Sequence, residues 1–166
     1  MNWAEPMTYT GIDNLHRITP SLYRSVQIAP NDIAQLRALG IRKIVSFRSF
    51  HSDETMLAGS GITLMRIPVN TWNIRDNDMI AALKALHDVD RDGPVLIHCQ
   101  HGTDRTGLVS ALYRVVYQGW STQQAEDELL RGGYGFHPIW GNIRRYLERV
   151  DVVRFQQQVG VTSGKA

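Results

Sequence analysis

The sequence predicts a single α/β domain in which a central, mostly parallel sheet is flanked by helices. The chain has 166 residues, of which 43% are hydrophobic, and this is the size of one ordinary domain with a substantial core. Apolar runs of strand length come early, whereas helical periods dominate the second half. One strongly apolar run, residues 94–99, leads through a short loop directly into a helix. In α/β folds such a junction lies at the carboxyl edge of the sheet, where ligands usually bind.

The first half of the chain alternates short strands with helix signals. Strands are expected at residues 22–25, 41–47 and 62–69. A helix is expected over 30–40, with Asn31 as its N-cap and Gly40 as its end. Its apolar face would contain Ile33, Leu36 and Leu39.

The second half is mainly helical. After a helix over 76–89 and the buried strand 94–99, helices are expected at residues 105–117, 122–131 and 139–156. The apolar positions of the first of these helices are Met79, Ile80, Leu83 and Leu86. The domain is expected to span 1–156, and residues 157–166 are expected to form a frayed tail.

Charge and hydropathy exclude several function classes. With 18 basic and 16 acidic residues, the net charge of +2 is too balanced for bulk attraction to nucleic acid or membranes. No apolar run approaches the roughly 20 residues needed to cross a bilayer, so no membrane insertion is expected. The opening "MNWAEPMTYTG" lacks the pattern of an export signal. As it stands the chain is expected to be soluble and cytoplasmic, with a bacterial periplasmic location after signal-peptide removal as the alternative.

The stretch "HCQHGTDRTG", residues 98–107, carries the chemistry. Cys99 is the only cysteine, so it is a packing thiol, a metal ligand or a reactive group. A loop that runs from a strand into a helix start presents several backbone N–H groups and the positive end of the helix dipole to one point, which attracts anions. Gly102 and Gly107 allow close approach, and the planar fork of Arg105 matches two oxygens of a phosphate. The same groups favour a thiolate at Cys99.

This stretch is similar to the His-Cys-x5-Arg-Ser/Thr-Gly phosphate loop of cysteine-based protein tyrosine phosphatases. The closest branch is that of the compact bacterial dual-specificity-like phosphatases. Four further segments resemble that branch: residues 14–27, 44–54, 67–72 and 132–143. The resemblance implies that the phosphate loop lies between the buried strand and the following helix.

The resemblance also implies a role for each loop residue. Cys99 would attack phosphorus to give a cysteinyl-phosphate, Thr106 would hydrogen-bond the thiolate as it leaves, and His98 would orient the loop from behind. The phosphate would be held by residues 100–105, namely Gln100, His101, Gly102, Thr103, Asp104 and Arg105. No metal or other cofactor is implied.

Two aspartates are candidates for the general acid that protonates the leaving oxygen. In many relatives an aspartate follows the strand that ends in "IP", but here that place reads "IPVNTWNIRDND" and Asp76 is the nearest carboxylate. Its alternative role is a helix N-cap, and Asp78 is expected in the first helical turn. The second candidate is Asp104, because "DRT" resembles the loop of lipid-directed cysteine phosphatases. Its alternative role is to stiffen the loop. Asp76 ranks slightly ahead.

Residues near the predicted loop have competing interpretations. A metal site formed by His98, Cys99 and His101 is disfavoured, because alternation sends the first two in opposite directions. Trp72 and His137 either cover the pocket rim or belong to the core. Two arginine features are treated as scaffold: Arg48 tying its loop to a carboxylate, and a solvated face made of Arg144, Arg145 and Arg149.

Three functions remain open. The first is a phosphatase of phosphotyrosine proteins, with phosphoserine and phosphothreonine as further substrates, acting as a monomer on a phosphorylated protein partner. The second is a phosphoinositide or inositol phosphate phosphatase, which the absence of lysine from the loop disfavours. The third is a binding module that captures phosphorylated ligands without turnover.

Overall fold

A computed structural model describes residues 2–8, 11–49, 52–100 and 104–161. Within these residues six strands form one sheet: β1 (Glu5–Pro6), β2 (His16–Thr19), β3 (Leu22–Ser25), β4 (Lys43–Ser46), β5 (Thr63–Arg66) and β6 (Val95–His98). Their order is β1-β2-β3-β6-β4-β5. The pairs β3–β6, β6–β4 and β4–β5 are parallel, and the pairs β1–β2 and β2–β3 are antiparallel. The predicted central, mostly parallel sheet is therefore confirmed.

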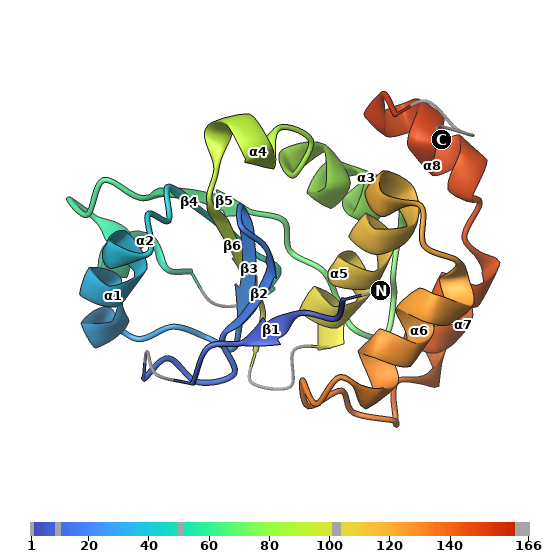
Figure 1. Ribbon diagram of the computed structural model, residues 1–166, viewed down its shortest axis with the longest axis horizontal. Helices are drawn as coiled ribbons and strands as arrows, with labels where there is room; N and C mark the ends of the chain where they lie inside the picture. Colours follow the sequence, from blue (N-terminus) through green and yellow to red (C-terminus); the bar gives the residue numbers. More distant parts are fainter. Residues whose placement is uncertain (1, 9–10, 50–51, 101–103, 162–166) are drawn as a thin grey trace.

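Helices cover both faces of this sheet. They are the 3₁₀ turn η2 (Pro30–Asp32) and the helices α1 (Ile33–Ala38), α2 (Glu54–Leu57), α3 (Asp76–Ala85), α4 (Val89–Asp92), α5 (Asp104–Gln118), α6 (Thr122–Arg131), α7 (Gly141–Arg149) and α8 (Val152–Val159). In Figure 1, α1 and α2 lie on one side of the sheet, and α3 and α5 to α8 lie on the other. The predicted α/β architecture is thus present.

Strand β6 separates two hydrophobic clusters, because successive side chains of a strand point to opposite faces. Ile97 and Cys99 belong to the larger cluster, on the side of α3 and α5. Leu96 belongs to the smaller cluster, with Leu36 of α1 and Leu57 just at the end of α2. Since both faces are covered, the central strand can be buried along its whole length, as the sequence indicated.

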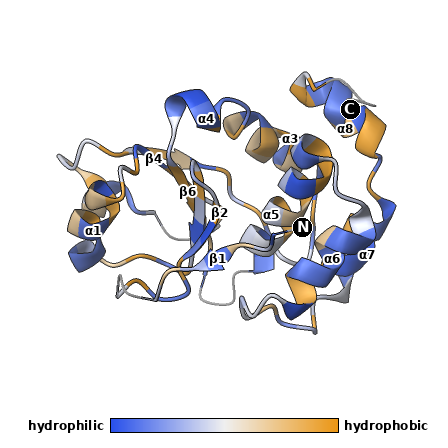
Figure 2. Cartoon of the chain, in the orientation of Figure 1, coloured by the Kyte–Doolittle hydropathy of each residue, from blue (hydrophilic) through white to orange (hydrophobic). Residues whose placement is uncertain are grey.

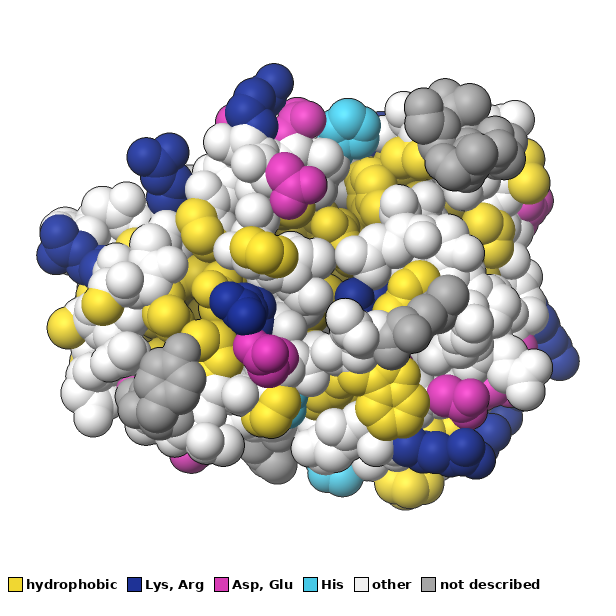
Figure 3. Space-filling model, in the orientation of Figure 1, with side chains coloured by type: hydrophobic (Ala, Val, Ile, Leu, Met, Phe, Trp, Pro, Cys, Tyr) yellow, Lys and Arg dark blue, Asp and Glu magenta, His cyan; other side chains and the backbone are white. Residues whose placement is uncertain are grey.

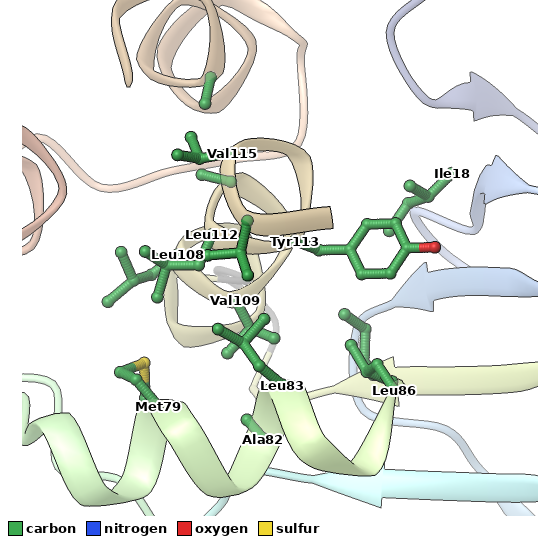
Figure 4. Close-up of a cluster of buried hydrophobic side chains, with 14 of the residues drawn as sticks. Ile18, Met79, Ala82, Leu83, Leu86, Leu108, Val109, Leu112, Tyr113 and Val115 are labelled. Atoms are coloured by element: carbon green, nitrogen blue, oxygen red, sulfur yellow. The ribbon is translucent and has the colours of Figure 1, made fainter. Parts of the chain in front are cut away.

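The larger cluster is built around the contact between α3 and α5. Figure 4 shows Leu108 and Leu112 of α5 directed toward Met79 and Leu83 of α3. These pairs repeat at a spacing of four residues, so each helix presents one apolar stripe. Burying each such side chain contributes about 1.5–3 kcal/mol, and α5 is thereby fixed against the sheet. The outer helices α4, α6 and α7 are largely hydrophilic (Figure 2).

The expected helix over 30–40 begins differently from the prediction. Ala29 occupies the N-cap position and Asn31 lies inside the turn η2, so the expected N-cap role of Asn31 is wrong. Pro30 explains the difference, since the fixed φ of proline favours the first position of a helical turn. The predicted end is confirmed, because Gly40 has a φ of 82° just after the helix.

Two of the expected long helices are each interrupted. The helix expected over 76–89 ends at Ala85, and the one expected over 139–156 divides into α7 and α8. The second break lies at Val150, which is extended, and Asp151 then caps α8 by accepting a hydrogen bond from the N–H of Arg154 at 3.1 Å. Helix α8 continues to Val159, so the chain is still helical at residues 157–159, where a frayed tail was expected.

The surface shows no strong charge segregation on the face drawn in Figure 3, where charges of both signs are spread over the molecule. In the part of the chain that the structure describes, no helix combines the length and the hydropathy needed to cross a membrane.

Candidate active site

Cys99 lies directly after β6 and is 1% exposed. The backbone N–H of Thr106, in the first turn of α5, points at its sulfur with an N–Sγ distance of 3.4 Å. In this structure the backbone N–H of Thr106 contacts the thiol, whereas the expected hydrogen bond to a departing thiolate stays a prediction. The Thr106 hydroxyl is buried and has no hydrogen-bond partner within the described chain. A sulfur at a helix N-terminus is placed where negative charge is stabilised.

Arg105 is anchored at the carboxyl ends of two strands. Its Nη1 donates to the carbonyl of Phe47 at 3.2 Å and to the carbonyl of Val69 at 2.9 Å. Its Nε is buried and, among the described residues, has no acceptor. A buried donor without a partner costs about 1–3 kcal/mol unless a ligand supplies the acceptor. One edge of the guanidinium is therefore held by the scaffold, and another edge is available to an anion.

A cavity of about 150 Å³ lies in front of this guanidinium. Its described lining residues are Arg48, Ser49, Asn70, Thr71, Trp72, Gln100 and Arg105. Trp72 is 64% exposed, so of its two alternative placements it takes the rim and is not part of the core. None of these described lining residues has a carboxylate. Of the predicted phosphate-binding residues, Gln100 and Arg105 line the cavity, whereas His101, Gly102 and Thr103 lie outside the described residues.

A chain of buried hydrogen bonds supports the loop from the opposite face of β6. His98 Nδ1 lies 3.0 Å from the carbonyl oxygen of Cys99, and His98 Nε2 lies 2.5 Å from Asp53 Oδ2. Gln27 Nε2 donates to the other carboxylate oxygen of Asp53 at 2.7 Å, and Arg48 Nη1 donates to Gln27 Oε1 at 2.9 Å. The predicted position of His98 behind the loop is therefore observed. The network connects the backbone at Cys99 with the wall of the cavity.

Asp53 is a site residue that the sequence did not reveal. It lies just before α2, 45 positions away from His98. The expectation that Arg48 ties its loop to a carboxylate holds only indirectly, because Gln27 stands between them. A histidine at the end of a buried strand does signal a buried acceptor. That signal does not say which of the 16 acidic residues supplies it.

Asp76 is engaged away from the cavity that Arg105 lines. Tyr146 donates its hydroxyl to Asp76 Oδ1 at 2.5 Å, and Arg154 donates to Oδ2 at 2.7 Å. The hydrogen bond from Tyr146, followed by the contact with Arg154, lowers the pKa of the Asp76 carboxyl. A general acid needs the opposite shift. The expected N-cap role of Asp76 is also wrong, because Arg75 occupies that position and Asp76 is the first residue of α3.

Asp76 instead lines a second, larger cavity of about 460 Å³ between the segment that leads from β5 into α3 and helix α7 with the two residues that follow it. Trp72 lines both cavities. Asp78 lies in the first turn of α3, as predicted.

Asp104 is the first residue of α5 and is almost completely buried. Its Oδ1 accepts the backbone N–H of His137 at 2.7 Å, and its Oδ2 lies 2.8 Å from Nδ1 of the same residue. The side chain of His137 is 50% exposed, so the predicted rim residue touches both solvent and the phosphate loop. Asp104 therefore connects the segment between α6 and α7 with the first turn of α5, next to Arg105.

No group of three or more histidine, cysteine, aspartate and glutamate side chains among residues 2–8, 11–49, 52–100 and 104–161 could hold a metal ion. Thus the site consists of a thiol at a helix N-terminus, an arginine with one available edge, and hydrogen-bonded supports on both sides of the sheet.

Comparisons with known proteins point in the same direction. The family model described as "Swiss Army Knife protein, DSP-PTPase phosphatase domain" (PTP-SAK) matches residues 16–138. The dual specificity protein phosphatase TpbA of Pseudomonas aeruginosa is 36% identical over 139 residues, which cover 84% of this chain and 63% of that protein. The chain thus spans less than two thirds of the length of this relative. The inositol diphosphatase DSP2 of Oryza sativa is 32% identical over 123 residues, covering 69% of this chain and 59% of that protein.

The fold also matches a solved structure. The crystal structure of P. aeruginosa TpbA in complex with pTyr superposes with a TM-score of 0.85 and 32% identity, covering 95% of this chain and 96% of that chain.

Proposed function

The chain belongs to the family of Swiss Army Knife DSP-PTPase phosphatase domains, and from this membership we propose that it hydrolyses phosphate monoesters of phosphotyrosine proteins through a cysteinyl-phosphate. Phosphoserine and phosphothreonine proteins are proposed as further substrates. The observation that carries the proposal is the placement of the Cys99 sulfur at the Thr106 N–H, in the loop that ends at a guanidinium with one edge available.

In the first step, the Cys99 thiolate attacks phosphorus and forms an S–P bond while the P–O bond to the substrate breaks. Arg105 and the N–H groups of the loop hold the phosphoryl oxygens, on which charge accumulates. The leaving oxygen takes a proton and departs as an alcohol or phenol. In the second step, water attacks phosphorus and gives a proton to the group that protonated the leaving oxygen; the S–P bond breaks, inorganic phosphate leaves, and the Cys99 thiolate is restored. The Thr106 N–H stabilises that thiolate as it leaves.

Asp104, together with His137, is the proposed source of the proton. Asp104 Oδ2 lies 2.8 Å from His137 Nδ1, and the half-exposed imidazole connects this buried carboxylate with solvent. Asp76 is the weaker candidate, since its hydrogen bonds favour the ionised carboxylate. Proton donation of this kind contributes about 10²–10⁴ in rate for a poor leaving group.

A tyrosine phosphate is the proposed substrate for two reasons. The rim residue Trp72 presents an aromatic ring against which a phenyl ring can pack. In addition, the solved structure that matches this chain contains pTyr.

An inositol phosphate is the alternative substrate, favoured by the similarity to inositol diphosphatase DSP2 and by Arg48, which adds a second cation to the cavity wall. A third possibility, a module that binds phosphorylated ligands without turnover, requires that the proton donor be absent or misplaced.

The test is hydrolysis by the purified chain of p-nitrophenyl phosphate, a phosphotyrosine peptide and an inositol pyrophosphate, without added metal. We expect turnover that vanadate inhibits, faster on the peptide than on the inositol substrate. Cys99→Ser should abolish turnover and keep peptide binding, with the exposed Thr55→Ser as the control. Turnover by Cys99→Ser would overturn the covalent mechanism, and faster turnover of the inositol substrate would establish the alternative.

A further inference from the structure

Arg24 is a fully buried arginine behind the phosphate loop. It lies in β3, opposite Ile97 of β6 in the parallel register, and is 2% exposed. Its guanidinium lies 4.1 Å from the centre of the Tyr134 ring. A cation in the interior is costly unless an anion and hydrogen-bond acceptors compensate it.

The described part of the chain supplies no such compensation directly. Nε and Nη2 of Arg24 are buried without a hydrogen-bond acceptor, and no described carboxylate forms an ion pair with this side chain. Burial lowers the pKa of Arg24, and Tyr134, Glu128 and Cys99 oppose that shift. The guanidinium therefore lies within electrostatic range of the sulfur.

The nearest buried carboxylate already has a cation of its own. Glu128 accepts hydrogen bonds from Arg114 at 2.9 and 3.0 Å. It also accepts from the hydroxyl of Tyr134 at 2.8 Å and from the N–H of Ala4 at 2.7 Å. Arg114 thus neutralises Glu128, and Arg24 is left as the unpaired positive charge of this buried cluster.

Gly107 brings the helix that starts at the phosphate loop close to this charge. A Cβ atom at residue 107 would lie 3.6 Å from Arg24 Nη2 and only 2.6 Å from Cδ1 of Leu129. Gly107 directly follows Thr106, whose N–H contacts the Cys99 sulfur. The guanidinium therefore lies against the same helical turn that touches the nucleophile.

We propose that Arg24 is a positioning residue whose buried charge holds Cys99 as a thiolate and favours an anion in the loop, a role that rests on the proposed function of this site. The unpaired cation and the anion of the loop compensate each other across the first turn of α5. Arg105 contacts the phosphate from the cavity side, whereas Arg24 acts from the core side and does not touch the substrate.

Other charged and titratable groups lie on the elements that flank Arg24 and Cys99, and these groups stay unchanged in the test. They are His16 of β2, His98 of β6 with Asp53 before α2, Asp104, Arg105 and Arg114 of α5, Glu128 of α6, and Tyr134 and His137 after α6. Only the residue at position 24 differs between the variants, so a change in the behaviour of Cys99 reports on that position.

The experiment measures the rate of Cys99 alkylation by iodoacetamide against pH in the full chain. Because Cys99 is the only cysteine, the signal is specific, and the measurement needs no turnover. In Arg24→Met we expect the midpoint of the pH profile to rise by about 1 unit or more, and vanadate binding to weaken by about tenfold. Arg24→Lys should recover most of the shift, and the exposed control Arg144→Met should match the original chain.

An unchanged midpoint in a folded Arg24→Met protein would overturn the inference, since a purely structural role would change only the melting temperature. Arg24→Gln serves if the methionine variant does not fold. If neither neutral variant folds, Arg24→Lys decides: a midpoint within about 0.5 unit of the original supports the charge, and a midpoint near that of free cysteine, about 8.5, contradicts it. If the alkylation midpoint shifts in Arg24→Met but the original chain hydrolyses no phosphate ester, the role of Arg24 stands and only the proposed function is refuted.

Discussion

The imidazole of His98 and the carboxylate of Asp53 meet at 2.5 Å inside the protein, and both side chains are completely buried. The ring bonds the carbonyl of Cys99 with its other nitrogen, so the pair fixes the backbone at which the phosphate loop starts. Asp53 belongs to the segment before α2, on the opposite side of the sheet from the thiol. The orientation of the nucleophile therefore depends on a side chain that does not itself line the cavity at Arg105.

Replacing Asp53 with asparagine should weaken both folding and catalysis. The variant replaces one oxygen of a buried carboxylate that contacts His98 and Gln27, and a buried polar group that loses its hydrogen-bond partner costs about 1–3 kcal/mol of unfolding free energy. Urea unfolding and kcat on p-nitrophenyl phosphate would measure the two effects, and we expect kcat to fall about tenfold or more because the loop loses its support. The exposed Asp92→Asn is the matched control. Unchanged kcat in folded Asp53→Asn would show that the loop holds its shape without this pair.

The two candidate acids can be separated by the leaving group of the substrate. p-Nitrophenolate leaves with little protonation, whereas an alkyl alcohol does not, so loss of the acid harms alkyl phosphates more. We expect Asp104→Asn to lose about 10²–10⁴ in kcat on an alkyl phosphate and far less on p-nitrophenyl phosphate. Asp76→Asn should affect both substrates equally and weakly. The reverse pattern would assign the proton to Asp76, and equal large losses for Asp104→Asn would make that carboxylate structural.

Asp76 should stabilise the protein in a pH-dependent way. Its folded pKa lies below the unfolded value of about 3.9, so its contribution is complete above that value and is lost as pH falls through the folded pKa. Because the pair with Arg154 is about half exposed, we expect at most about 1 kcal/mol.

Melting temperatures of the original chain and of Asp76→Asn would test this contribution. They should differ at pH 7 and converge near pH 2. The variant Tyr146→Phe, which removes the first cause of the shift, should behave similarly. A difference that persists at pH 2 would mean that packing, not charge, is responsible.

The rim residue Trp72 should contribute to substrate binding and little to stability. An aromatic contact is worth about 0.5–1.5 kcal/mol, so Trp72→Ala should raise KM for a phosphotyrosine peptide about 2–12-fold. KM for a small alkyl phosphate, which has no aromatic ring, should change less. The melting temperature should stay within about a degree. Trp3→Ala, at another partly exposed tryptophan, is the control. Equal KM in both variants would place the substrate ring elsewhere.

The parts of the fold and site that the sequence predicted depend on local signals. The apolar run of β6, the loop at Cys99 and the stripe of α5 are contiguous, so their chemistry can be recognised without knowing the fold. Gly40 is a similar case, because its positive φ ends a helix through its own backbone.

What the sequence did not predict depends on contacts across the fold. Asp104 and His137 are 33 positions apart, and Asp76 and Arg154 are 78 positions apart. Asp76 was favoured as the acid because of its place in the chain, but helices α7 and α8 bring competing donors to it. Arg24 lies in an unremarkable strand, and only the packing of Gly107 against it shows what the buried charge faces.

The pairing of β6 with two parallel neighbours also determines which side chain can react. Val95, Ile97 and their neighbours are matched residue for residue with both β3 and β4. A slip of one position in these ladders would exchange the faces of the strand. It would turn the imidazole toward α5 and the thiol toward α2. A slip has to break hydrogen bonds on both sides of β6 at once. The double pairing therefore fixes the face of the sheet on which the nucleophile lies.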